Sequence, residues 1–518
     1  MAVLADHSVL DDIARSGAEV ITDAESLEFF AHDIMGRGAD LRAVVRPDDK
    51  DQLAAAVAAA TGQGLAVIPR GGGVSYTGGY TPSQPGAVLF DLGAMDRVLD
   101  INETDRTVTV EAGCSWAKLH ETLAPLGLRT PYWGTLSGLK ATVGGSMSQN
   151  AIFWGSGRYG TAAQNCHALE VVLADGSILK TGPQFTRPYG PDLSGIFLAD
   201  TGALGIKATI TMPLIPEAKA HGYASFIFET HQDVLGAVAE IERAGIATEC
   251  FGFDPGLNAI RMKRDSLSSD AKALGTMMKK QDSVWKALKE GAKVVAAGRD
   301  FLDEAKFSLH VLTEGRIQAA ADADLEAART IAMAHGASET DNTIPKIIRA
   351  NPFGPLNGML GPEGQRWAPI HGLLPHSKVA GCYEAIEALF AQHREEMDQH
   401  GMFTGTLITA VGGAGTIIEP CIYWPDESYG VHAQSMDAAH YAKLPKPDAN
   451  PAARAVAHRL KQALVDLFHQ WGAVHYQIGR TYRYRESLTP EADSLLQSIK
   501  QTVDPHGLMN PGALGLER

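Results

Sequence analysis

The chain has 518 residues, of which 45% are hydrophobic and 20% are charged, and its formal net charge is −15 at pH 7. This length and composition predict a globular protein of two to four domains and exclude a fibrous or wholly disordered chain. The negative charge argues against nucleic acid as a partner, because binding to phosphates needs a basic surface. Glycine is the outlier, since its 54 residues exceed the usual share of about 7% without any repeat to explain them.

The cysteines and the N-terminus bear on the compartment. The five cysteines are far apart and include no CxxC pair, which predicts neither a zinc ribbon nor a disulfide framework. Acidic residues stand near the start, where a signal peptide needs basic ones, and no run of about 18 apolar residues predicts a membrane-spanning helix. We therefore expect a cytoplasmic protein with reduced thiols and no membrane span.

From residue 39 onward, short apolar strands alternate with helical patterns, which predicts an α/β or α+β arrangement. Pro47 to Asp49 predicts the start of a helix that ends at Gly62 to Gly64. A strand over 65–68 and a glycine-rich loop over 69–79 follow it. The alternation over 107–111 predicts another strand, and residues 169–181 predict a hairpin that turns at Asp175 and Gly176.

The composition changes after residue 216. Residues 257–306 have a helical, locally basic pattern, which is more typical of a solvated helix face than of a docking site for an acidic partner. Near the C-terminus, residues 456–471 predict an amphipathic helix and residues 490–503 a closing helix. We infer two domains, with the C-terminal tail returning to complete the first.

The first glycine-rich segment is PRGGGVSYTGG at residues 69–79. Glycines after a strand let the backbone approach a ligand closely, and consecutive free N–H groups form a concave site for an anion such as a pyrophosphate. The alternative is a mobile surface turn. The number of glycines directly after a buried strand favours phosphate binding.

The second segment, residues 131–160, contains a GxGxxG match at Gly155, Gly157 and Gly160. A nicotinamide dinucleotide fold would need a strand before this motif and a full helix after it. The sequence SMSQNAIFW before it is not a clean strand, and about eight residues separate Gly160 from the next strand. The context therefore disfavours a Rossmann fold, and no P-loop motif occurs.

An ordered set of motifs resembles the FAD-binding domain of the vanillyl-alcohol oxidase / p-cresol methylhydroxylase (PCMH-type) flavoprotein family. The motifs are PRGGGVSYTGG, ATVGGSMSQNA, RYGT, LEVVLADGSIL and YGPDLSGIFLADTGALGI, and the closing VDPHGLMNPG is similar to the family's C-terminal signature. The resemblance covers roughly residues 39–216 and 450–515. It implies an α+β fold in which a two-subdomain FAD-binding domain (1–217, completed by 451–518) carries a separate α+β cap domain (218–450).

The resemblance further implies FAD as the cofactor and assigns residues to it. Arg70 to Ser75 would wrap the pyrophosphate, residues of the second segment would line the flavin, and residues 202–206 would lie near the adenosine or ribityl part. Asn510 and Gly512 would close the site. The residues predicted to bind the cofactor are Pro69, Arg70, Gly71, Gly72, Gly73, Val74, Ser75, Gly79, Thr142, Gly144, Gly145, Ser148, Asn150, Gly160, Thr161, Gly202, Gly205, Ile206 and Asn510.

The substrate class is less sharply indicated, because the family has a branch that oxidises 4-alkylphenols and aromatic alcohols and another that oxidises D-2-hydroxy acids. Tyr76 stands where the phenol branch carries a tyrosine, and Arg366 and Trp367 begin a segment that resembles its cap strand. Ala473 to Tyr476 resembles a further segment of that branch. The hydroxy-acid GDGNxH element is absent, although Ile478 to Arg480 matches the end of another of its motifs.

We therefore predict an FAD-dependent oxidase or dehydrogenase that oxidises a phenolic or benzylic substrate by hydride transfer to flavin N5. The alternatives are a D-2-hydroxy-acid dehydrogenase and a flavin-binding protein without catalysis. The residues predicted to bind phenolate or carboxylate, with His475 able to accept a proton near neutral pH, are Tyr76, His475, Tyr476 and Arg480. Those predicted to contact substrate in the cap are Arg366, Trp367 and His371.

The remaining expectations concern attachment, metals and partners. The positions at which relatives bond FAD covalently fall at Leu356 and near Gln365, so we predict non-covalent FAD. A metal site built from His371, His376 and Glu419 is disfavoured because their spacing is irregular. The electron acceptor (oxygen, a cytochrome or a quinone) stays open, and a homodimer is the assembly that the resemblance implies.

Overall fold

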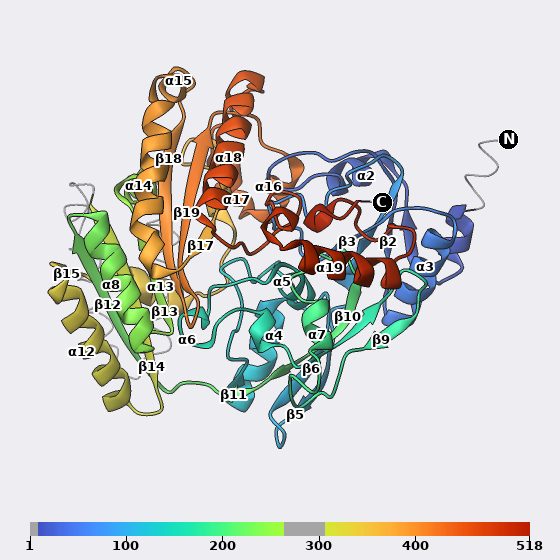
Figure 1. Ribbon diagram of the computed structural model, residues 1–518, viewed down its shortest axis with the longest axis horizontal. Helices are drawn as coiled ribbons and strands as arrows, with labels where there is room; N and C mark the ends of the chain where they lie inside the picture. Colours follow the sequence, from blue (N-terminus) through green and yellow to red (C-terminus); the bar gives the residue numbers. More distant parts are fainter. Residues whose placement is uncertain (1–8, 264–305, 518) are drawn as a thin grey trace.

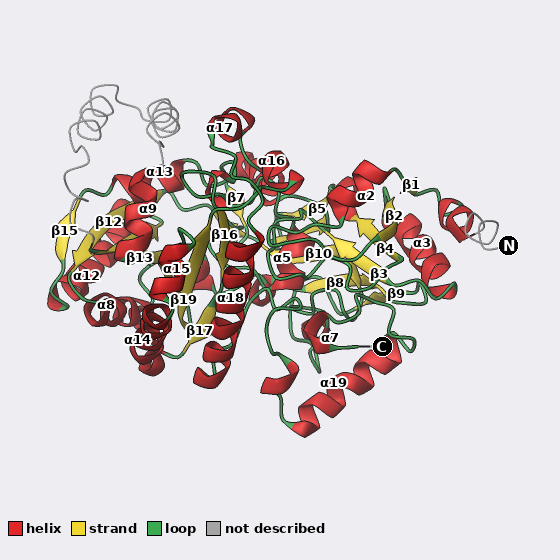
Figure 2. Ribbon diagram, turned by 90° about the horizontal axis from the view of Figure 1, so that it is seen from above, coloured by secondary structure: helices red, strands yellow, loops and turns green. Residues whose placement is uncertain are grey.

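The computed structural model describes residues 9–263 and 306–517 of the chain. Figure 2 shows two parts side by side, one around two smaller sheets that contains the N-terminal strands, and one around a single large sheet. This α+β organisation agrees with the predicted fold class. The predicted basic helical segment lies largely outside the described residues, which include only its beginning in α9 (Pro255–Lys263).

The first sheet has the strand order β1-β2-β4-β3, with β1 (Glu19–Ile21), β2 (Leu41–Arg46), β4 (Ala87–Asp91) and β3 (Val67–Arg70). β2 and β3 both run parallel to β4. The crossover helix α3 (Lys50–Gly62) begins after Asp49, whose side chain accepts hydrogen bonds from the amides of Asp51 and Gln52. The helix therefore starts later than Pro47, because the Asp49 cap sets its first turn.

The second sheet is antiparallel throughout, with the order β5-β6-β10-β8-β9. The predicted hairpin is confirmed, since β8 and β9 pair across a turn in which Asp175 accepts a hydrogen bond from the Ser177 amide. Helix α5 (Val143–Gln149) packs on β10. The strands are β5 (Val98–Asn102), β6 (Thr107–Glu111), β8 (Ala168–Val172), β9 (Ile178–Lys180) and β10 (Ile206–Pro213).

The cap sheet has the order β15-β12-β14-β13-β18-β19-β16, and β17 also pairs with β19. Helices α8, α12, α14 and α18 pack on this sheet (Figure 1). The strands are β12 (Ala220–Phe228), β13 (Glu249–Phe253), β14 (Phe307–Gly315), β15 (Ser338–Thr340), β16 (Arg366–Pro369), β17 (Gly372–Leu374), β18 (Phe403–Val411) and β19 (Gly415–Trp424). The helices are α8 (His231–Ala244), α12 (Gln318–Ala334), α14 (His376–Gln392) and α18 (Pro451–Trp471).

The C-terminal region is divided between the two parts of the molecule. α18 packs on α14 and β19 of the cap sheet, although the sequence predicts residues from 451 onward with the FAD-binding domain. After Trp471 the chain crosses over to the FAD-binding part. There the Val67 amide donates to the Leu508 carbonyl, and the Asn510 amide donates to the Val67 carbonyl. The closing helix α19 has the predicted bounds, Pro490–Val503.

The GxGxxG match has a structural explanation other than nucleotide binding. Helix α6 (Ser156–Tyr159) within the motif is only one turn long. A Cβ atom at Gly157 would lie 2.7 Å from the Thr248 carbonyl oxygen, and one at Gly155 would lie 2.2 Å from the Pro131 carbonyl oxygen. These glycines therefore permit close packing between segments, which agrees with the prediction that the motif does not belong to a Rossmann fold. No helix of the described chain combines the length and apolarity that a bilayer crossing needs.

Candidate active site

A cavity of about 700 Å³ lies between the glycine-rich segments and the cap sheet. Residues from all three of the predicted glycine-rich regions line it, at 69–80, 141–153 and 201–207. The cap contributes strands β13, β18 and β19 and the segment 347–359. The structure therefore brings together at one cavity segments that are more than 100 residues apart in sequence.

The loop after β3 presents a row of free backbone donors to this cavity. In the described part of the chain, the amides of Gly71 to Ser75 donate no hydrogen bond to another protein group, and all five residues line the cavity. Arg70 lies at the start of the row, with its guanidinium 4.7 Å from the Phe30 ring centroid and 3.8 Å from Asp91. Such a concave row of N–H groups is a ready site for a pyrophosphate.

The glycines of this cradle are needed by the protein packing itself. A Cβ at Gly72 would lie 1.8 Å from the Lys140 carbonyl oxygen, and one at Gly202 would lie 2.5 Å from the Pro69 ring. Only Gly73 among residues 71–73 has a positive φ, at 65°. Close approach to a ligand, the reason that the sequence suggests for these glycines, is therefore not the whole explanation, because a side chain at Gly72 or Gly202 would already collide with a neighbouring loop.

Most of the residues predicted to bind the cofactor line the cavity, and four do not. The four are Asn150, Gly160, Thr161 and Asn510. Asn150 ends α5 and its side-chain oxygen accepts a hydrogen bond from the Ala163 amide. Asn510 donates to the carbonyls of Gly79 and Thr201, each at 2.7 Å. Asn150 and Asn510 therefore hold the cavity loops in place from behind.

At the cap end of the cavity, a carboxyl, a phenol and an amide form a largely buried hydrogen-bonded group. The Tyr76 hydroxyl donates to Glu419 on β19 at 2.9 Å and accepts from the Gln477 side-chain amide at 3.0 Å. Burial raises the pKa of Glu419 to about 7, and burial together with the Glu419 charge raises the pKa of Tyr76 well above its ordinary value. Near neutral pH Glu419 can therefore exchange a proton, whereas Tyr76 stays protonated. Sequence reasoning did not single out Gln477, and considered Glu419 only as a metal ligand.

His371 lines the same cavity but has both ring nitrogens engaged. Its Nε2 accepts a hydrogen bond from the Tyr476 amide at 3.0 Å, so the ring proton resides on Nδ1, which donates to the Tyr482 hydroxyl at 3.1 Å. Burial lowers the pKa of His371 to about 3. His371 is therefore neutral and orients Tyr476, which also lines the cavity.

Three other residues predicted at the substrate have side chains that are engaged away from the cavity lining. Arg480 donates to the carbonyls of Thr81 and Pro511, and Arg366 to those of Ile34 and Met35. His475 donates to the His371 carbonyl at 2.8 Å and stacks on Tyr482, and burial lowers its pKa to about 4. Backbone carbonyls thus occupy the Arg480 and Arg366 guanidinium groups, contrary to the predicted direct contact with substrate. The lowered pKa makes His475 a weak proton acceptor near neutral pH, contrary to its predicted role.

The cap side of the cavity is mainly apolar apart from Glu419, His371 and a few amide and hydroxyl side chains, and it carries no lysine or arginine in the described chain. Among the described residues, the lysine and arginine side chains that line the cavity as a whole are Arg70 and Lys207, both on the glycine-rich side. Lys207 is ion-paired with Asp200. Trp367, which the sequence predicts to contact substrate, lines the cavity, and its ring centroid lies 5.6 Å from that of Tyr76. The other large apolar residues from the cap are Phe251, Phe253, Leu257, Ile347, Ile348, Leu356, Met359, Leu407, Ile417 and Tyr423.

The disfavoured metal set is not assembled. His376 contacts Glu242 at 2.8 Å and the Thr416 hydroxyl at 3.2 Å, whereas His371 contacts Tyr482. Over residues 9–263 and 306–517, no group of three or more His, Cys, Asp or Glu side chains could hold a metal ion.

Comparison with protein families accounts for the cradle. Residues 41–182 match the family described as FAD binding domain, and residues 477–514 match the C-terminal domain of FAD linked oxidases. The cofactor is FAD. The free amides of Gly71 to Ser75, which line the cavity, fit its pyrophosphate.

Curated relatives match part of the chain. A probable mitochondrial D-lactate dehydrogenase of Danio rerio is 34% identical over 209 residues, which is 39% of this chain and 41% of the relative. A glycolate oxidase subunit of Bacillus subtilis is 28% identical over 206 residues, or 39% of this chain and 43% of the relative. The match thus spans less than half the length of these relatives.

Solved structures match nearly the whole chain at low identity. p-Cresol methylhydroxylase with substrate bound has a TM-score of 0.70 at 15% identity, covering 99% of this chain and 97% of that one. The 4-ethylphenol oxidase of Gulosibacter chungangensis has a TM-score of 0.67 at 17% identity with the same coverages. An alkyldihydroxyacetonephosphate synthase scores 0.66 at 15% identity, covering 95% and 82%. The PCMH-type FAD-binding fold with its cap is therefore confirmed.

Proposed function

We propose that this protein is an FAD-dependent oxidoreductase that oxidises a phenolic or benzylic substrate by hydride transfer. The observation that carries the proposal is the buried Tyr76, Glu419 and Gln477 group at the end of an apolar cavity whose cap wall has no lysine or arginine in the described chain. An aromatic ring fits such a wall, and a single carboxyl is enough to accept the proton of its hydroxyl group.

In the proposed reaction, the hydride goes to FAD and the side chains at the cap end handle the proton. FAD supplies a two-electron hydride acceptor to reactions of this kind. Glu419 accepts the hydroxyl proton as the substrate C–H bond breaks and the C=O bond forms, while Tyr76, which accepts a hydrogen bond from Gln477, donates its own hydrogen bond to Glu419 and so holds the carboxylate in place. The aromatic contacts of Trp367 and Tyr423 hold the ring and exclude water.

The second candidate is oxidation of a D-2-hydroxy acid, which the D-lactate dehydrogenase and glycolate oxidase relatives favour. A hydroxy acid brings a carboxylate that needs a cationic partner. Lys207 is committed to Asp200, and Arg70 lies at the pyrophosphate cradle. The arrangement of cations therefore supports the aromatic substrate over the hydroxy acid.

Anaerobic mixing separates these functions from each other and from flavin binding without catalysis. The purified, FAD-loaded protein is mixed with 4-alkylphenols, aromatic alcohols or D-2-hydroxy acids, and the visible absorbance of the oxidised flavin is followed. We expect bleaching by the aromatic compounds. Bleaching by hydroxy acids alone would establish the second candidate, and bleaching by none would favour a non-catalytic role.

The acceptor of the electrons is examined by the same preparation. Reduced protein is mixed with oxygen, a cytochrome or a quinone, and the fastest reoxidation identifies the class. We propose a small-molecule substrate and a homodimer on the strength of the resemblance, and a cytoplasmic location because the scattered cysteines indicate a reducing compartment. Gel filtration with light scattering measures the oligomeric state.

A further inference from the structure

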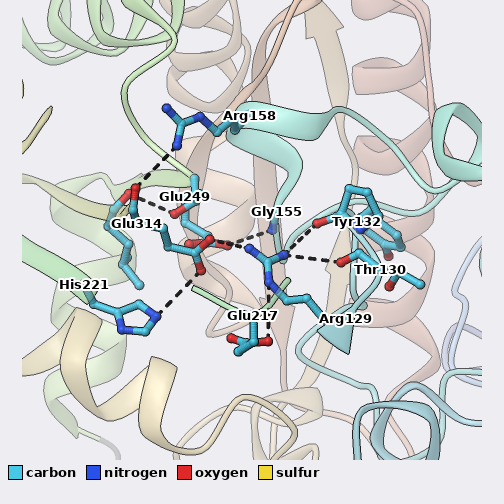
Figure 3. Close-up of polar contacts among 12 residues, drawn as sticks. Arg129, Thr130, Tyr132, Gly155, Arg158, Glu217, His221, Glu249 and Glu314 are labelled. Carbon is cyan, nitrogen blue, oxygen red and sulfur yellow. Dashed lines mark hydrogen bonds and ion pairs between the residues drawn. The ribbon is translucent and has the colours of Figure 1, made fainter. Parts of the chain in front are cut away.

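Buried ion pairs join the FAD-binding part to the cap, through side chains that are not themselves part of the cavity lining (Figure 3). Arg129 of β7 (Leu128–Arg129) is ion-paired with Glu314 of β14, and both are almost fully buried. Arg129 also lies 3.5 Å from Glu217, in the connection between the two parts. Arg349 completes the group, with its guanidinium 2.9 Å from Glu217 and 3.5 Å from Glu314. We call Arg129, Glu217, Glu314 and Arg349 the interdomain charge cluster.

Arg349 makes a further contact with an aromatic group of the FAD-binding part. Its guanidinium lies 4.6 Å from the centroid of Trp133, which stacks on Trp154 at 4.8 Å. Phe353 meets the Trp133 ring edge-on at 5.6 Å and fills the space over Gly138, where a Cβ would lie 2.3 Å from its ring. Ion pairs and aromatic contacts therefore both fix the segment around Arg349 against the FAD-binding part.

The segment that carries Arg349 is also a wall of the substrate cavity. Helix α13 (Thr343–Ala350) contributes Ile347 and Ile348 to the lining, and residues 351–352 and 354–359 continue it. The helix has no side-chain hydrogen bond at its N-cap, and only Pro345 of its residues is buried. A helix of this length has little stability of its own, so its position depends on tertiary contacts.

We propose that Arg349 is a positioning residue for the substrate site. By bridging Glu217 and Glu314 and covering Trp133, it fixes α13, and α13 sets the wall formed by Ile347, Ile348 and the segment that follows. This inference rests on the proposed function, because it assigns the wall to the substrate.

The charges explain why the contact is strong. Glu217 and Glu314 are both within ion-pair distance of Arg129 and Arg349, so removal of Arg349 leaves a buried carboxylate without full compensation. A lysine keeps the charge but lacks the planar fork that reaches two carboxylates and lies flat on a ring. The order expected for the strength of the contact is therefore arginine, lysine, methionine.

The test compares Arg349→Met and Arg349→Lys with a matched control, Arg329→Met. Arg329 on α12 is ion-paired with Glu339 at 2.7 Å and with Glu326, within the cap and outside the cavity lining. Amide hydrogen exchange of residues 343–359 is measured on the FAD-loaded protein. We expect exchange there to rise at least about tenfold in Arg349→Met and less in Arg349→Lys, with no change in the control, because local opening tracks lost contacts.

Steady-state kinetics with the best aromatic substrate supply the second readout. We expect KM to rise about tenfold in Arg349→Met and less in Arg349→Lys, with kcat within about threefold, as for a loss of binding that ground state and transition state share. Unchanged exchange in residues 343–359 overturns the proposal, and so does increased exchange with unchanged KM. If Arg349→Met does not retain FAD, Arg349→Lys carries both readouts.

Failure of the proposed function is recognised independently. It appears in the wild type, when no aromatic compound bleaches the flavin, before any variant is made. In that case the exchange experiment still decides whether Arg349 fixes α13, and KM is measured with whichever compound class reduces the flavin. If no class does, the assignment of the wall to a substrate is wrong.

Discussion

Glu419 is the residue on which the proposed chemistry depends most. It lies in the interior of a strand, and its carboxyl accepts a hydrogen bond from a phenol that stays protonated. Burial raises the pKa of the Glu419 carboxyl to about 7, which is where a general base works best near neutral pH. A packing residue at this position would be apolar, because an unpaired buried carboxyl costs stability.

Replacement of Glu419 by glutamine is expected to slow flavin reduction by roughly 10²- to 10⁴-fold, the usual contribution of a general base. In the wild type, the reduction rate should rise with pH through about 7, because the base acts in its ionised form. Stopped-flow reduction across pH 5.5–9 measures both effects. Glu387→Gln, on α14 and outside the cavity lining, is the control and should keep the wild-type profile. An unaltered profile in Glu419→Gln would show that another group takes the proton.

Gly72 tests the glycine argument at the cradle. Gly72→Ala would place a Cβ 1.8 Å from the Lys140 carbonyl oxygen. Because that oxygen belongs to the backbone and cannot rotate away as a side chain could, the loop must shift and its free amides lose their alignment. We expect FAD affinity to fall at least about tenfold, equal to about 1.4 kcal/mol. Gly62→Ala, at a helix end with open space around it, should leave FAD binding unchanged. Flavin titration followed by fluorescence measures both, and equal affinities would contradict the steric account.

At the scale of elements, strand β13 links the cap sheet to the FAD-binding part through Glu249. Its Oε1 accepts a hydrogen bond from the Gly155 amide at 2.7 Å, while Glu314 and Arg349 lie close enough to act on its charge. Burial and then the Glu314 charge raise the pKa of Glu249 to about 7. The strand therefore carries a carboxyl that holds its proton at pH values where an exposed glutamate is ionised.

The stability of the protein should reflect this proton. Because the folded-state pKa is raised, the contribution of Glu249 is fully present below the ordinary pKa near 4.5 and is lost as pH rises through about 7. The loss is roughly 3 kcal/mol at most. Glu249→Gln removes this pH dependence, so its unfolding free energy relative to wild type should increase between pH 5 and pH 8. Denaturant unfolding at several pH values measures the difference, and Glu326→Gln on the surface should show a constant one.

At the scale of the whole molecule, the two parts meet on both sides of the cavity. The C-terminal chain leaves α18 on the cap and returns to the FAD-binding part, and Gln477 on this return joins the Tyr76 and Glu419 group. The cap wall, the tail and the cradle therefore assemble one site. Formation of the substrate end depends on correct association of the two parts, whereas the pyrophosphate cradle depends on the FAD-binding part alone.

The way the molecule holds FAD leads to a prediction for the intact protein. Leu356, where the resemblance predicts the attachment position of one subgroup, lines the cavity as an apolar residue, and Gln365 accepts a hydrogen bond from the Glu363 amide outside the lining. We expect FAD to be released when the protein is denatured and precipitated, with all of the flavin absorbance in the supernatant. Flavin that stays with the precipitated polypeptide would contradict this.

Much of the cradle was accessible from sequence because its residues are contiguous. The loop over 69–79 follows a strand directly, so the spacing of its glycines reports the backbone that presents the amides. The hairpin at 169–181 and the helix at 490–503 were predicted for the same reason, since turn residues and periodicity act over a few neighbours. The start of α3 was misplaced because a cap is decided by one side chain, Asp49.

The excess of glycine, and with it the FAD site, was determined by the sequence itself, because local backbone chemistry leaves a local pattern. The tertiary structure alone decided the substrate end. Tyr76 and Glu419 are 343 positions apart and meet only when the cap folds over the cavity. Burial then changes their chemistry: it raises the pKa of Glu419 to about 7, keeps His371 neutral and leaves Arg480 hydrogen-bonded to backbone carbonyls. These are properties of the environment that folding creates, which no short stretch of sequence encodes.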